Sequence, residues 1–350
     1  MENTSFRAII SDFKKPYITT KEFRELKEGE VLVKVLTATI NPADRDLAFG
    51  KVEAPGIESL LPIGLGFEGS GVIEDGYGEQ EKKLIGTPTA ICFDPINPME
   101  IGTWSEYVYM QAKDVMPFPE GTDSETICAL GNPLTSFSMM ERIEKGGHKA
   151  VVQSASCSAL GKIFFRLCQK QGIPTINIVR KEEQIDIMKD IGAEHVLNST
   201  SETFEGDLKE LATRLQATIF FDPIGGDFIL QVLRVLPANS SVVCLDNLSH
   251  KPISFDPLEL IFQQKEISSL HSPAWMSNQS SERINEIFSE IANDISNATS
   301  SYSQDGQKAP GGIFTTKIYK SYPLEEIESA IEDSIQNAYK GKTIFKPHST

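Results

Sequence analysis

The chain has little of what marks membrane, secreted or zinc-stabilised proteins. No segment of its 350 residues approaches the roughly 18 unbroken apolar residues of a membrane span. The five cysteines are scattered and odd in number, so we predict neither a disulfide framework nor a CxxC zinc lobe. The start, MENTSFRAIISDFKKPY, lacks the cationic and apolar blocks of a signal peptide. We expect a cytoplasmic protein, with the mitochondrial matrix as the alternative compartment.

Positive charge is also scarce. Thirty-three Lys and Arg against 49 Asp and Glu give a net charge of −16. Such a chain repels polyanions, which excludes nucleic acid and anionic membranes as main partners but leaves room for a local basic pocket. A chain of this length, with 40% hydrophobic residues, suits two globular domains.

The pattern of the chain changes near residue 126. Before it, short β-branched runs such as 31–39 (VLVKVLTAT) are separated by many glycines and prolines, which is typical of a β-rich domain. After it, strands alternate with helices, as in a doubly wound parallel sheet. We expect strands at 149–153, 175–179, 195–197, 218–221 and 241–245, and helices at 159–171, 182–191 and 205–215.

The last part of the chain starts with a polar segment. Residues 296–312 (SNATSSYSQDGQKAPGG) are rich in Ser, Gly and Asn, and we predict a mobile loop there. A strand at 313–319, a helix at 324–338 and a strand at 342–346 are expected to follow.

The segment 150–180 predicts a site for a nucleotide. A hydrophobic strand enters a loop of small residues, from Ser154 to Gly161, and a helix follows directly. Small side chains let a pyrophosphate approach the backbone, where the free N–H groups and the helix dipole bind its charge. Only Gly161 is a glycine, so the plain GxGxxG fingerprint is absent and the motif alone is weak.

The end of the second strand of this unit points to a particular nucleotide. NAD sites usually place Asp or Glu there, on the ribose 2′-hydroxyl. This strand ends in Arg180 and Lys181, which favours a 2′-phosphate and therefore NADPH. The alternative is that both are solvated charges at the start of the next helix.

Eight motifs in order carry a family resemblance. They are INPADRD (40–46), GFEGSGVI (66–73), GTWSEY (102–107), NPLTSF (132–137), ASCSALG (155–161), INIVR (176–180), FDPIGG (221–226) and GKTIFKP (341–347). With them the chain resembles the zinc-independent medium-chain dehydrogenase/reductase superfamily, which includes quinone oxidoreductases and mitochondrial-type 2-enoyl thioester reductases.

The resemblance implies an α/β fold of two domains. A chaperonin-10-like β-rich catalytic domain would comprise 1–125 and 313–350, and a doubly wound Rossmann domain would comprise 126–295, with the mobile loop at 296–312. Substrate would bind in the cleft where the domains meet.

The resemblance also assigns site residues. Asn132 and Thr135 would lie near the nicotinamide, although Asn132 could instead form a turn before Pro133, and Lys342 would lie near the cofactor or simply close a turn. The implied catalytic residues are Asn41, Asp44 and Thr135. The implied cofactor-binding residues are Asn132, Ser156, Cys157, Ser158, Ala159, Leu160, Gly161, Arg180, Lys181, Leu245 and Lys342.

The same comparison predicts no metal site. Zinc-dependent relatives carry His in a GHE motif, and here that place is Phe67. Phenylalanine cannot bind zinc, and Glu68 alone leaves too few ligands. Glu68 is therefore interpreted as structural.

Two departures leave the function open. Related enoyl thioester reductases have a Tyr proton donor after the INPxD motif, but no Tyr lies between Asp44 and Gly76, and Glu53 could replace it only with a raised pKa. The loop starting at Leu245 is not glycine-rich and contains Asp246. We predict an NADPH-dependent, zinc-free reductase of quinones or α,β-unsaturated carbonyl compounds.

The alternative is a catalytically silent relative that acts as a binding or scaffold subunit. A homodimer is expected by resemblance, through the strand at 241–245 or the segment 267–275.

Overall fold

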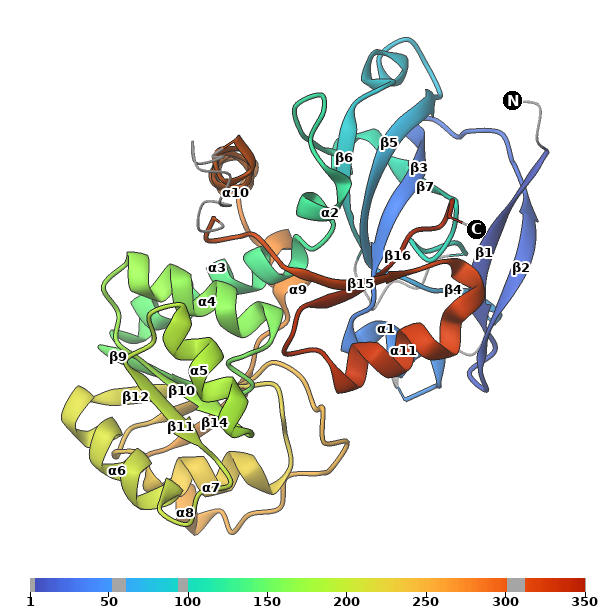
Figure 1. Ribbon diagram of the computed structural model, residues 1–350. Coiled ribbons are helices and arrows are strands. Elements are labelled where there is room, and N and C mark those ends of the chain that lie inside the picture. The colour runs from blue at the N-terminus through green and yellow to red at the C-terminus, as the bar shows by residue number, and fades with distance from the viewer. Residues whose placement is uncertain (1–3, 52–60, 94–99, 301–311, 350) are drawn as a thin grey trace. The chain divides into compact units, whose positions relative to one another are not determined.

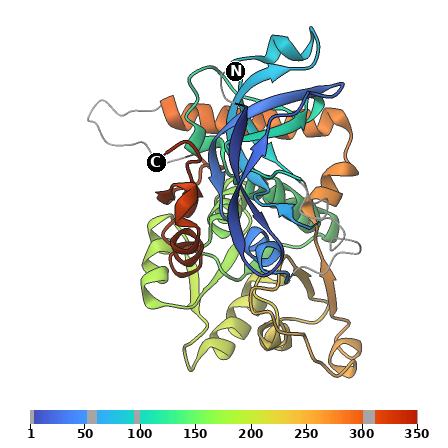
Figure 2. The same ribbon diagram turned by 90° about the vertical axis from the view of Figure 1, so that its right-hand side faces the viewer.

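The computed structural model describes residues 4–51, 61–93, 100–300 and 312–349. The chain divides into two compact units, drawn from two directions in Figures 1 and 2. One unit contains Met1–Gly131 together with Phe288–Thr350, so both ends of the chain contribute to it. The other contains Asn132–Ile287. The corresponding boundaries were expected near residues 126 and 295.

The first unit is built mainly on antiparallel strands. Its larger sheet has the order β15-β16-β3-β5-β6-β8, with β7 paired to β3 as well. Its smaller sheet has the order β2-β1-β4, and β1 and β2 form the dark blue ribbon of Figure 2. The strands are β1 (Ser5–Ser11), β2 (Pro16–Glu22), β3 (Glu30–Thr39), β4 (Ile63–Gly64), β5 (Glu68–Gly76), β6 (Pro88–Cys92), β7 (Tyr107–Gln111), β8 (Met116–Pro117), β15 (Ile318–Tyr322) and β16 (Lys342–Phe345).

This unit also contains short helices. They are α1 (Pro42–Ala48), the 3-10 turns η2 (Glu81–Leu84), η3 (Ala112–Asp114) and η4 (Leu324–Glu326), α2 (Ser124–Ile127) and α11 (Ile327–Gln336). The core forms where β3 places Val31, Val33 and Val35 on one buried face, as the alternation of its sequence predicts. Trp104 lies edge-on to Phe345 in the same core, which attaches the last strand to the first part of the chain.

Two expectations for the last part of the chain are wrong in detail. Helix α10 (Ser281–Ser300) continues through 296–300, where a loop was predicted, because Ile287, Ile291 and Ile295 repeat every four residues and are fully buried. The rest of the predicted loop, 301–311, lies outside the described residues. The strand expected at 313–319 begins only at Ile318, since Asp294 accepts the N–H of Phe314 at 2.9 Å and fixes a turn there.

The second unit is a doubly wound parallel sheet. Its strand order is β11-β10-β9-β12-β13-β14, so successive strands are added on one side of β9 and then on the other. This is the doubly wound topology that the alternating sequence predicts. Figure 1 shows α4 and α5 on one side of this sheet and α6 and α7 on the other. The strands are β9 (Ala150–Gln153), β10 (Thr175–Val179), β11 (His195–Asn198), β12 (Ala217–Asp222), β13 (Ser241–Cys244) and β14 (Glu266–Ser269). The helices are α3 (Gly131–Gly146), α4 (Ala159–Lys170), α5 (Glu182–Asp190), α6 (Phe204–Leu215), α7 (Asp227–Val235), α8 (Leu258–Ile261) and α9 (Ser272–Ser277).

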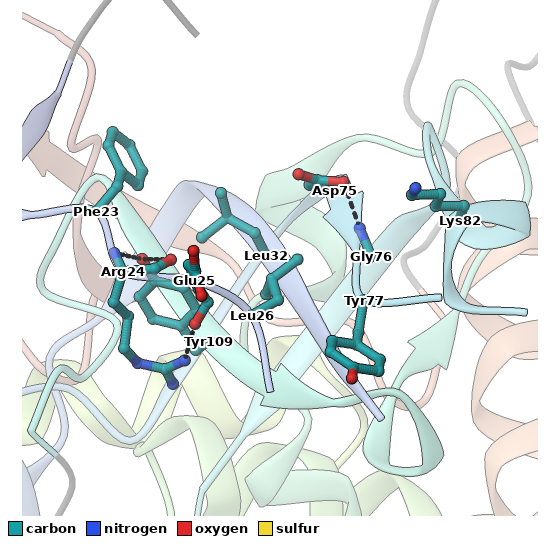
Figure 3. Close-up of a pocket in the computed structure, with 10 residues that line it drawn as sticks. All are labelled: Phe23, Arg24, Glu25, Leu26, Leu32, Asp75, Gly76, Tyr77, Lys82 and Tyr109. Atoms are coloured by element: carbon teal, nitrogen blue, oxygen red, sulfur yellow. Dashed lines mark hydrogen bonds between the residues drawn. The ribbon is translucent and has the colours of Figure 1, made fainter. Parts of the chain in front are cut away.

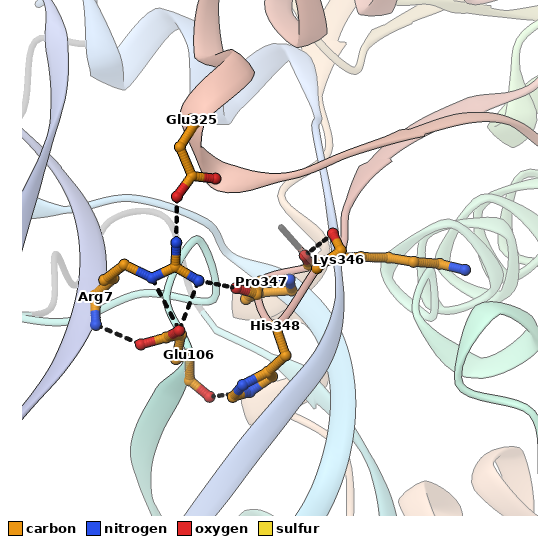
Figure 4. Close-up of polar contacts among 7 residues, drawn as sticks. Arg7, Glu106, Glu325, Lys346, Pro347 and His348 are labelled. Atoms are coloured by element: carbon orange, nitrogen blue, oxygen red, sulfur yellow. Dashed lines mark hydrogen bonds and ion pairs between the residues drawn. The ribbon is translucent and has the colours of Figure 1, made fainter. Parts of the chain in front are cut away.

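An ion-pair cluster joins the two ends of the chain in the first unit (Figure 4). The Arg7 guanidinium donates to Glu106 from Nε at 2.9 Å and from Nη2 at 2.8 Å. It also pairs with Glu325 and donates to the carbonyl of Pro347 at 3.0 Å. One side chain of the first strand thus binds groups that come more than 300 positions later.

Nowhere in the described part of the chain does a helix combine the length and apolar character that crossing a bilayer requires.

Candidate cofactor-binding and active site

The loop between β9 and α4 has the form of an anion site. Ser158 is the N-cap of α4, and its Oγ accepts the N–H of Gly161 at 3.0 Å. The N–H groups of Ala159 and Leu160, in the first helical turn, have no acceptor in the described part of the chain. Because the positive end of the helix dipole lies at the same place, this turn offers two donors to a phosphate.

Two side chains in the middle of this loop are buried in the protein. Ser156 is fully buried and its Oγ donates to the carbonyl of Gln153 at 3.1 Å. The Cys157 thiol lies 3.2 Å from the carbonyl oxygen of Gln184, and burial raises its pKa to about 11. A cofactor would therefore meet Ser156 and Cys157 through their backbone, as small residues in a phosphate loop allow.

Gly161 is required by the packing of the loop. A Cβ on Gly161 would lie 2.6 Å from the carbonyl oxygen of Ser156, closer than real Cβ contacts come. Ser156 in turn donates its N–H to Ile178 of β10 at 3.3 Å. The loop is thus fixed between its own helix and the neighbouring strand.

Arg180 and Lys181 differ in how free their charges are. Both donate their backbone N–H to Oε1 of Gln184, at 3.0 and 3.2 Å. Lys181 forms an ion pair with Glu183, with 3.5 Å between Nζ and Oε1. Arg180 is exposed, and its guanidinium has no partner within the described residues. Of the two, Arg180 is the cation more available to an anionic ligand.

A buried carboxylate connects the loop to the end of β12. Asp222 is fully buried, accepts a short hydrogen bond from Ser154 and accepts the N–H of Gly225 at 2.7 Å. Burial raises the pKa of Asp222, and the bond from Ser154 opposes that rise. Its backbone carbonyl accepts the N–H of Leu245 at 2.8 Å, so Leu245 lies at the same edge of the sheet. Asp246 next to it is exposed.

The start of α3 carries the two residues predicted near the nicotinamide. The Nδ2 of Asn132 is buried and has no hydrogen-bond partner within the described residues. A buried amide donor without a partner is costly in a folded protein, so it fits a ligand acceptor. The hydroxyl of Thr135 is 3.0 Å from that of Ser272. The unpartnered amide of Asn132 and the two unused N–H donors of α4 are the features that fit a dinucleotide.

A polar network occupies the first unit. Asn41 Nδ2 donates to Glu68 Oε2 at 2.9 Å, and the Lys342 ammonium donates to Asn41 Oδ1. Asp44 accepts the N–H of Asn41 at 2.7 Å and that of Phe67 at 2.8 Å. Two predicted catalytic residues and one predicted cofactor residue therefore lie together.

Asp44 has an unusual charge environment. It is fully buried, and burial raises its pKa to about 7, against the two backbone N–H bonds that lower it. Both oxygens serve the backbone, which gives Asp44 a role in fixing the turn into α1. A catalytic role for Asn41, Asp44 or Thr135 stays a prediction.

Several contacts were missed by sequence reasoning. The bond from Asn41 N–H to Asp44 follows the Ncap-to-N3 spacing of a capping box, which could have been recognised from the sequence. The contacts of Glu68 and the Ser154–Asp222 bond leave no local signal, because they join residues 27 or more positions apart.

The described residues contain no group of three or more His, Cys, Asp and Glu side chains placed to bind a metal ion. Phe67 donates its N–H to Asp44 at 2.8 Å, and its side chain has no atom that binds a metal. Zinc independence stays a prediction.

A separate cavity of about 370 Å³ lies elsewhere in the first unit (Figure 3). Arg24 forms one wall, with its guanidinium 3.9 Å from the ring centroid of Tyr109 and paired with Glu30 at 2.6 Å. Tyr77 and Lys82 line it too, and it contains none of the predicted site residues.

Two family models match the chain. The one described as "Alcohol dehydrogenase GroES-like domain" matches residues 27–120, and the one described as "Zinc-binding dehydrogenase" matches residues 159–292. The mitochondrial enoyl-[acyl-carrier-protein] reductase of Bos taurus is 24% identical over 325 residues, covering 91% of this chain and 81% of that protein.

Solved structures agree with these matches. A candidate NADPH:quinone reductase of Mesorhizobium loti has a TM-score of 0.79 and 25% identity, over 99% of both chains. This chain belongs to the medium-chain dehydrogenase/reductase superfamily. The structure of the ETR1P/NADP/crotonyl-CoA complex, with a TM-score of 0.75 over 98% of this chain and 99% of that one, is 17% identical and shares the fold.

Membership in the superfamily confirms the predicted fold class, a GroES-like β-rich domain with a Rossmann domain. It also makes the chain an oxidoreductase by family.

Proposed function

We propose that this medium-chain dehydrogenase/reductase is an NADPH-dependent, zinc-free oxidoreductase that transfers a hydride to a quinone or an α,β-unsaturated carbonyl compound, an enone or enoyl thioester. The observation that carries the proposal is the N-terminus of α4, where two N–H donors are unused. Helix α4 follows β9, and the neighbouring strand β10 ends just before Arg180, whose guanidinium has no partner in the described part of the chain. The names of its relatives, enoyl and quinone reductases, support the reaction class.

The residues of the second unit would bind the dinucleotide. Ala159 and Leu160 offer N–H groups to the pyrophosphate, and Arg180 offers its guanidinium to the 2′-phosphate. Asn132 offers its unpartnered amide to the nicotinamide. Lys342 is proposed as a further cofactor contact, because its ammonium donates only to a neutral amide in the described part of the chain.

NADPH supplies the hydride when bound. Hydride addition to the β-carbon of an α,β-unsaturated carbonyl compound would leave an enolate, with the negative charge shared by the carbonyl oxygen and the α-carbon, and the α-carbon would then need a proton. Reduction of a quinone leaves a stabilised oxyanion that water can protonate. The absence of a tyrosine donor therefore favours quinones and reactive enones. Glu53, the alternative acid, lies outside the described residues.

The zinc-free assignment rests on Phe67. A phenylalanine stands where a zinc ligand stands in zinc-dependent relatives, and the neighbouring Glu68 is already bonded to three donors. Metal analysis of the purified protein should find less than one zinc per ten chains, and chelator treatment should leave turnover unchanged.

A second candidate function is a catalytically silent binding or scaffold subunit. It is favoured by the exposed Asp246, which would bring negative charge toward the cofactor. Both functions share the fold, so only measurement of turnover separates them.

Turnover of NADPH tests the proposal. Purified protein is mixed with NADPH and a panel of quinones, enones and an enoyl thioester, and loss of NADPH absorbance is followed. The proposal expects consumption that depends on the acceptor and falls at least tenfold in Arg180→Ala. Binding of NADPH without consumption for any acceptor would favour the silent subunit.

A homodimer is also proposed. The strand β14 ends the parallel sheet, and the exposed Ile261 and Phe262 precede it, with 62% and 81% of their surface accessible. Light scattering should give about twice the chain mass of 38.7 kDa. Ser269→Pro, on the edge strand, should shift the protein to the monomer.

We propose that the protein lies in the cytoplasm. The mitochondrial matrix is the alternative, because several relatives are named mitochondrial. Fractionation of cells carrying the tagged protein decides between them.

A further inference from the structure

Glu68, which the sequence indicates to be structural, is a buried carboxylate. It is 4% exposed and stands at the start of β5. Its Oε1 accepts the N–H of Gly131, and its Oε2 accepts Thr39 Oγ1 at 3.1 Å and Asn41 Nδ2 at 2.9 Å. Its three hydrogen-bond donors are neutral, and no salt bridge joins it to a cation within the described residues.

The first consequence concerns Asn41 and Lys342. An ionised carboxylate only accepts hydrogen bonds, so Asn41 must turn its NH2 group toward Glu68. The Oδ1 of Asn41 then faces the Lys342 ammonium, which donates to it. If the amide were reversed, its NH2 group would face the ammonium. The charge on Glu68 therefore sets the position of Lys342 through Asn41.

The second consequence concerns α3. Gly131 is the first residue of that helix, and Glu68 places a negative charge on its N–H, where the helix dipole is positive. A Cβ at position 131 would lie 2.8 Å from Glu68 Oε1, so glycine is what lets the carboxylate approach. Asn132, with its orphan amide, is the next residue.

We propose that Glu68 is a positioning residue: it orients Lys342 through Asn41 and fixes the first turn of α3, from which Asn132 projects. The inference rests on the proposed function, because Lys342 and Asn132 matter as cofactor contacts. Glu68 itself touches neither cofactor nor substrate in this account.

The test uses the full chain and Glu68→Gln. The glutamine has the same shape, but its NH2 group must face a donor on one side or the other, either Gly131 N–H or Asn41 and Thr39. We expect two changes in the protein without any ligand. Hydrogen exchange at the start of α3 becomes several-fold faster, and Lys342 is acylated several-fold faster by an amine-specific reagent.

A matched control is Glu30→Gln. Glu30 is also a buried carboxylate of the first unit, 8% exposed, but it pairs with Arg24 away from Asn41 and Lys342. It should leave both readouts at their wild-type values. Glu68→Asp keeps the charge and should give smaller changes than Glu68→Gln. If Glu68→Gln does not fold, Glu68→Asp is measured in its place.

Cofactor binding is the third readout. Glu68→Gln should weaken NADPH by about tenfold, the loss of one hydrogen bond to a charged group. Unchanged exchange and acylation in Glu68→Gln would overturn the positioning role. If wild-type protein does not bind NADPH, the proposed function fails, while the exchange and acylation experiments still decide what Glu68 positions.

Discussion

At the scale of single residues, the proposed preference for NADPH over NADH rests on Arg180. Its guanidinium is exposed and has no protein partner in the described part of the chain, whereas the neighbouring Lys181 is paired with Glu183. A cation without a partner gains most from a 2′-phosphate, because it gives up no existing ion pair.

We therefore predict that Arg180→Ala weakens NADPH by roughly 10- to 100-fold, the range of a charge-assisted hydrogen bond, and leaves NADH unchanged. Fluorescence titration with each cofactor measures this. Lys181→Ala is the control and should have a smaller effect. Equal loss for both cofactors would place Arg180 outside the 2′-phosphate site.

Asp44 predicts a pH dependence of stability. Burial raises its pKa to about 7, whereas an unfolded Asp titrates near 3.9. Between these values the folded state keeps a proton that the unfolded state has lost, so this group's contribution to stability is complete below about pH 4 and is lost as the pH rises toward 7.

The difference in unfolding free energy between wild type and Asp44→Asn should therefore move against wild type as the pH rises from 4 to 7, by on the order of 4 kcal/mol at most. Urea denaturation at a series of pH values measures it. A flat difference would mean that the two backbone bonds balance the effect of burial on the pKa, and a difference moving the other way would mean that they outweigh it.

The role of a single residue was predictable only where the neighbouring sequence indicated it. Arg180 follows a recognisable strand, so its place could be found from the sequence. The three donors around Glu68 come from Thr39, Asn41 and Gly131, which only the folded chain brings together. The charge environment of Asp44 depends on burial, which no spacing reveals.

At the scale of elements, the loop between β9 and α4 depends on Gly161. A Cβ there would meet the Ser156 carbonyl at 2.6 Å, and that carbonyl is backbone that cannot move aside. The start of α4 and the loop at Ser156 would have to move apart.

Gly161→Ala should cost about 1–3 kcal/mol, the usual penalty of overpacking, and should weaken binding of NADPH and NADH alike. Gly206→Ala is the control, because Gly206 lies in α6 with nothing within 4 Å of an added Cβ. It should raise stability by roughly 0.5–1 kcal/mol. Thermal unfolding of both variants gives the comparison.

The elements expected between residues 149 and 245 match β9 to β13 and α4 to α6 closely, whereas α3, α7 and β14 were not predicted. In the last segment, the helix expected at 324–338 and the strand expected at 342–346 match η4 with α11 and β16. The strand 175–179 is β10 to the residue, because a buried parallel strand is a continuous apolar run. Helix α10 was not predicted, and its last residues, 296–300, were assigned to a loop, since its polar residues concealed the buried isoleucines at every fourth position. The turn at Phe314 depends on Asp294, which is distant in sequence, and β15 therefore begins later in the chain than expected.

At the scale of the whole molecule, both chain ends build the same unit, and the Arg7 cluster joins them. The guanidinium contacts Glu106, Glu325 and the Pro347 carbonyl. Glu106 is only 16% exposed on its side chain, so losing Arg7 leaves a largely buried charge.

Arg7→Ala should lower the unfolding free energy by about 1–3 kcal/mol, seen as a lower melting temperature. The control is Arg283→Ala, whose ion pair with Glu286 is exposed on both sides and is expected to contribute less than about 1 kcal/mol. Equal small effects would mean that the cluster contributes little to stability.

The division of the chain into two units was foreseeable from the change of pattern near residue 126. The return of the last strands to the first unit was not derivable from local pattern, and came only from the family resemblance. Pairing of β16 with β3 is a contact across some 300 positions, for which propensity carries no information.

The measurement that tests the central claim most directly is a calorimetric titration of the purified chain with NADPH and with NADH. The account predicts tight binding of NADPH, with NADH at least tenfold weaker. Equal affinity, or a preference for NADH, would contradict the 2′-phosphate role of Arg180, and binding of neither would contradict the cofactor site as a whole.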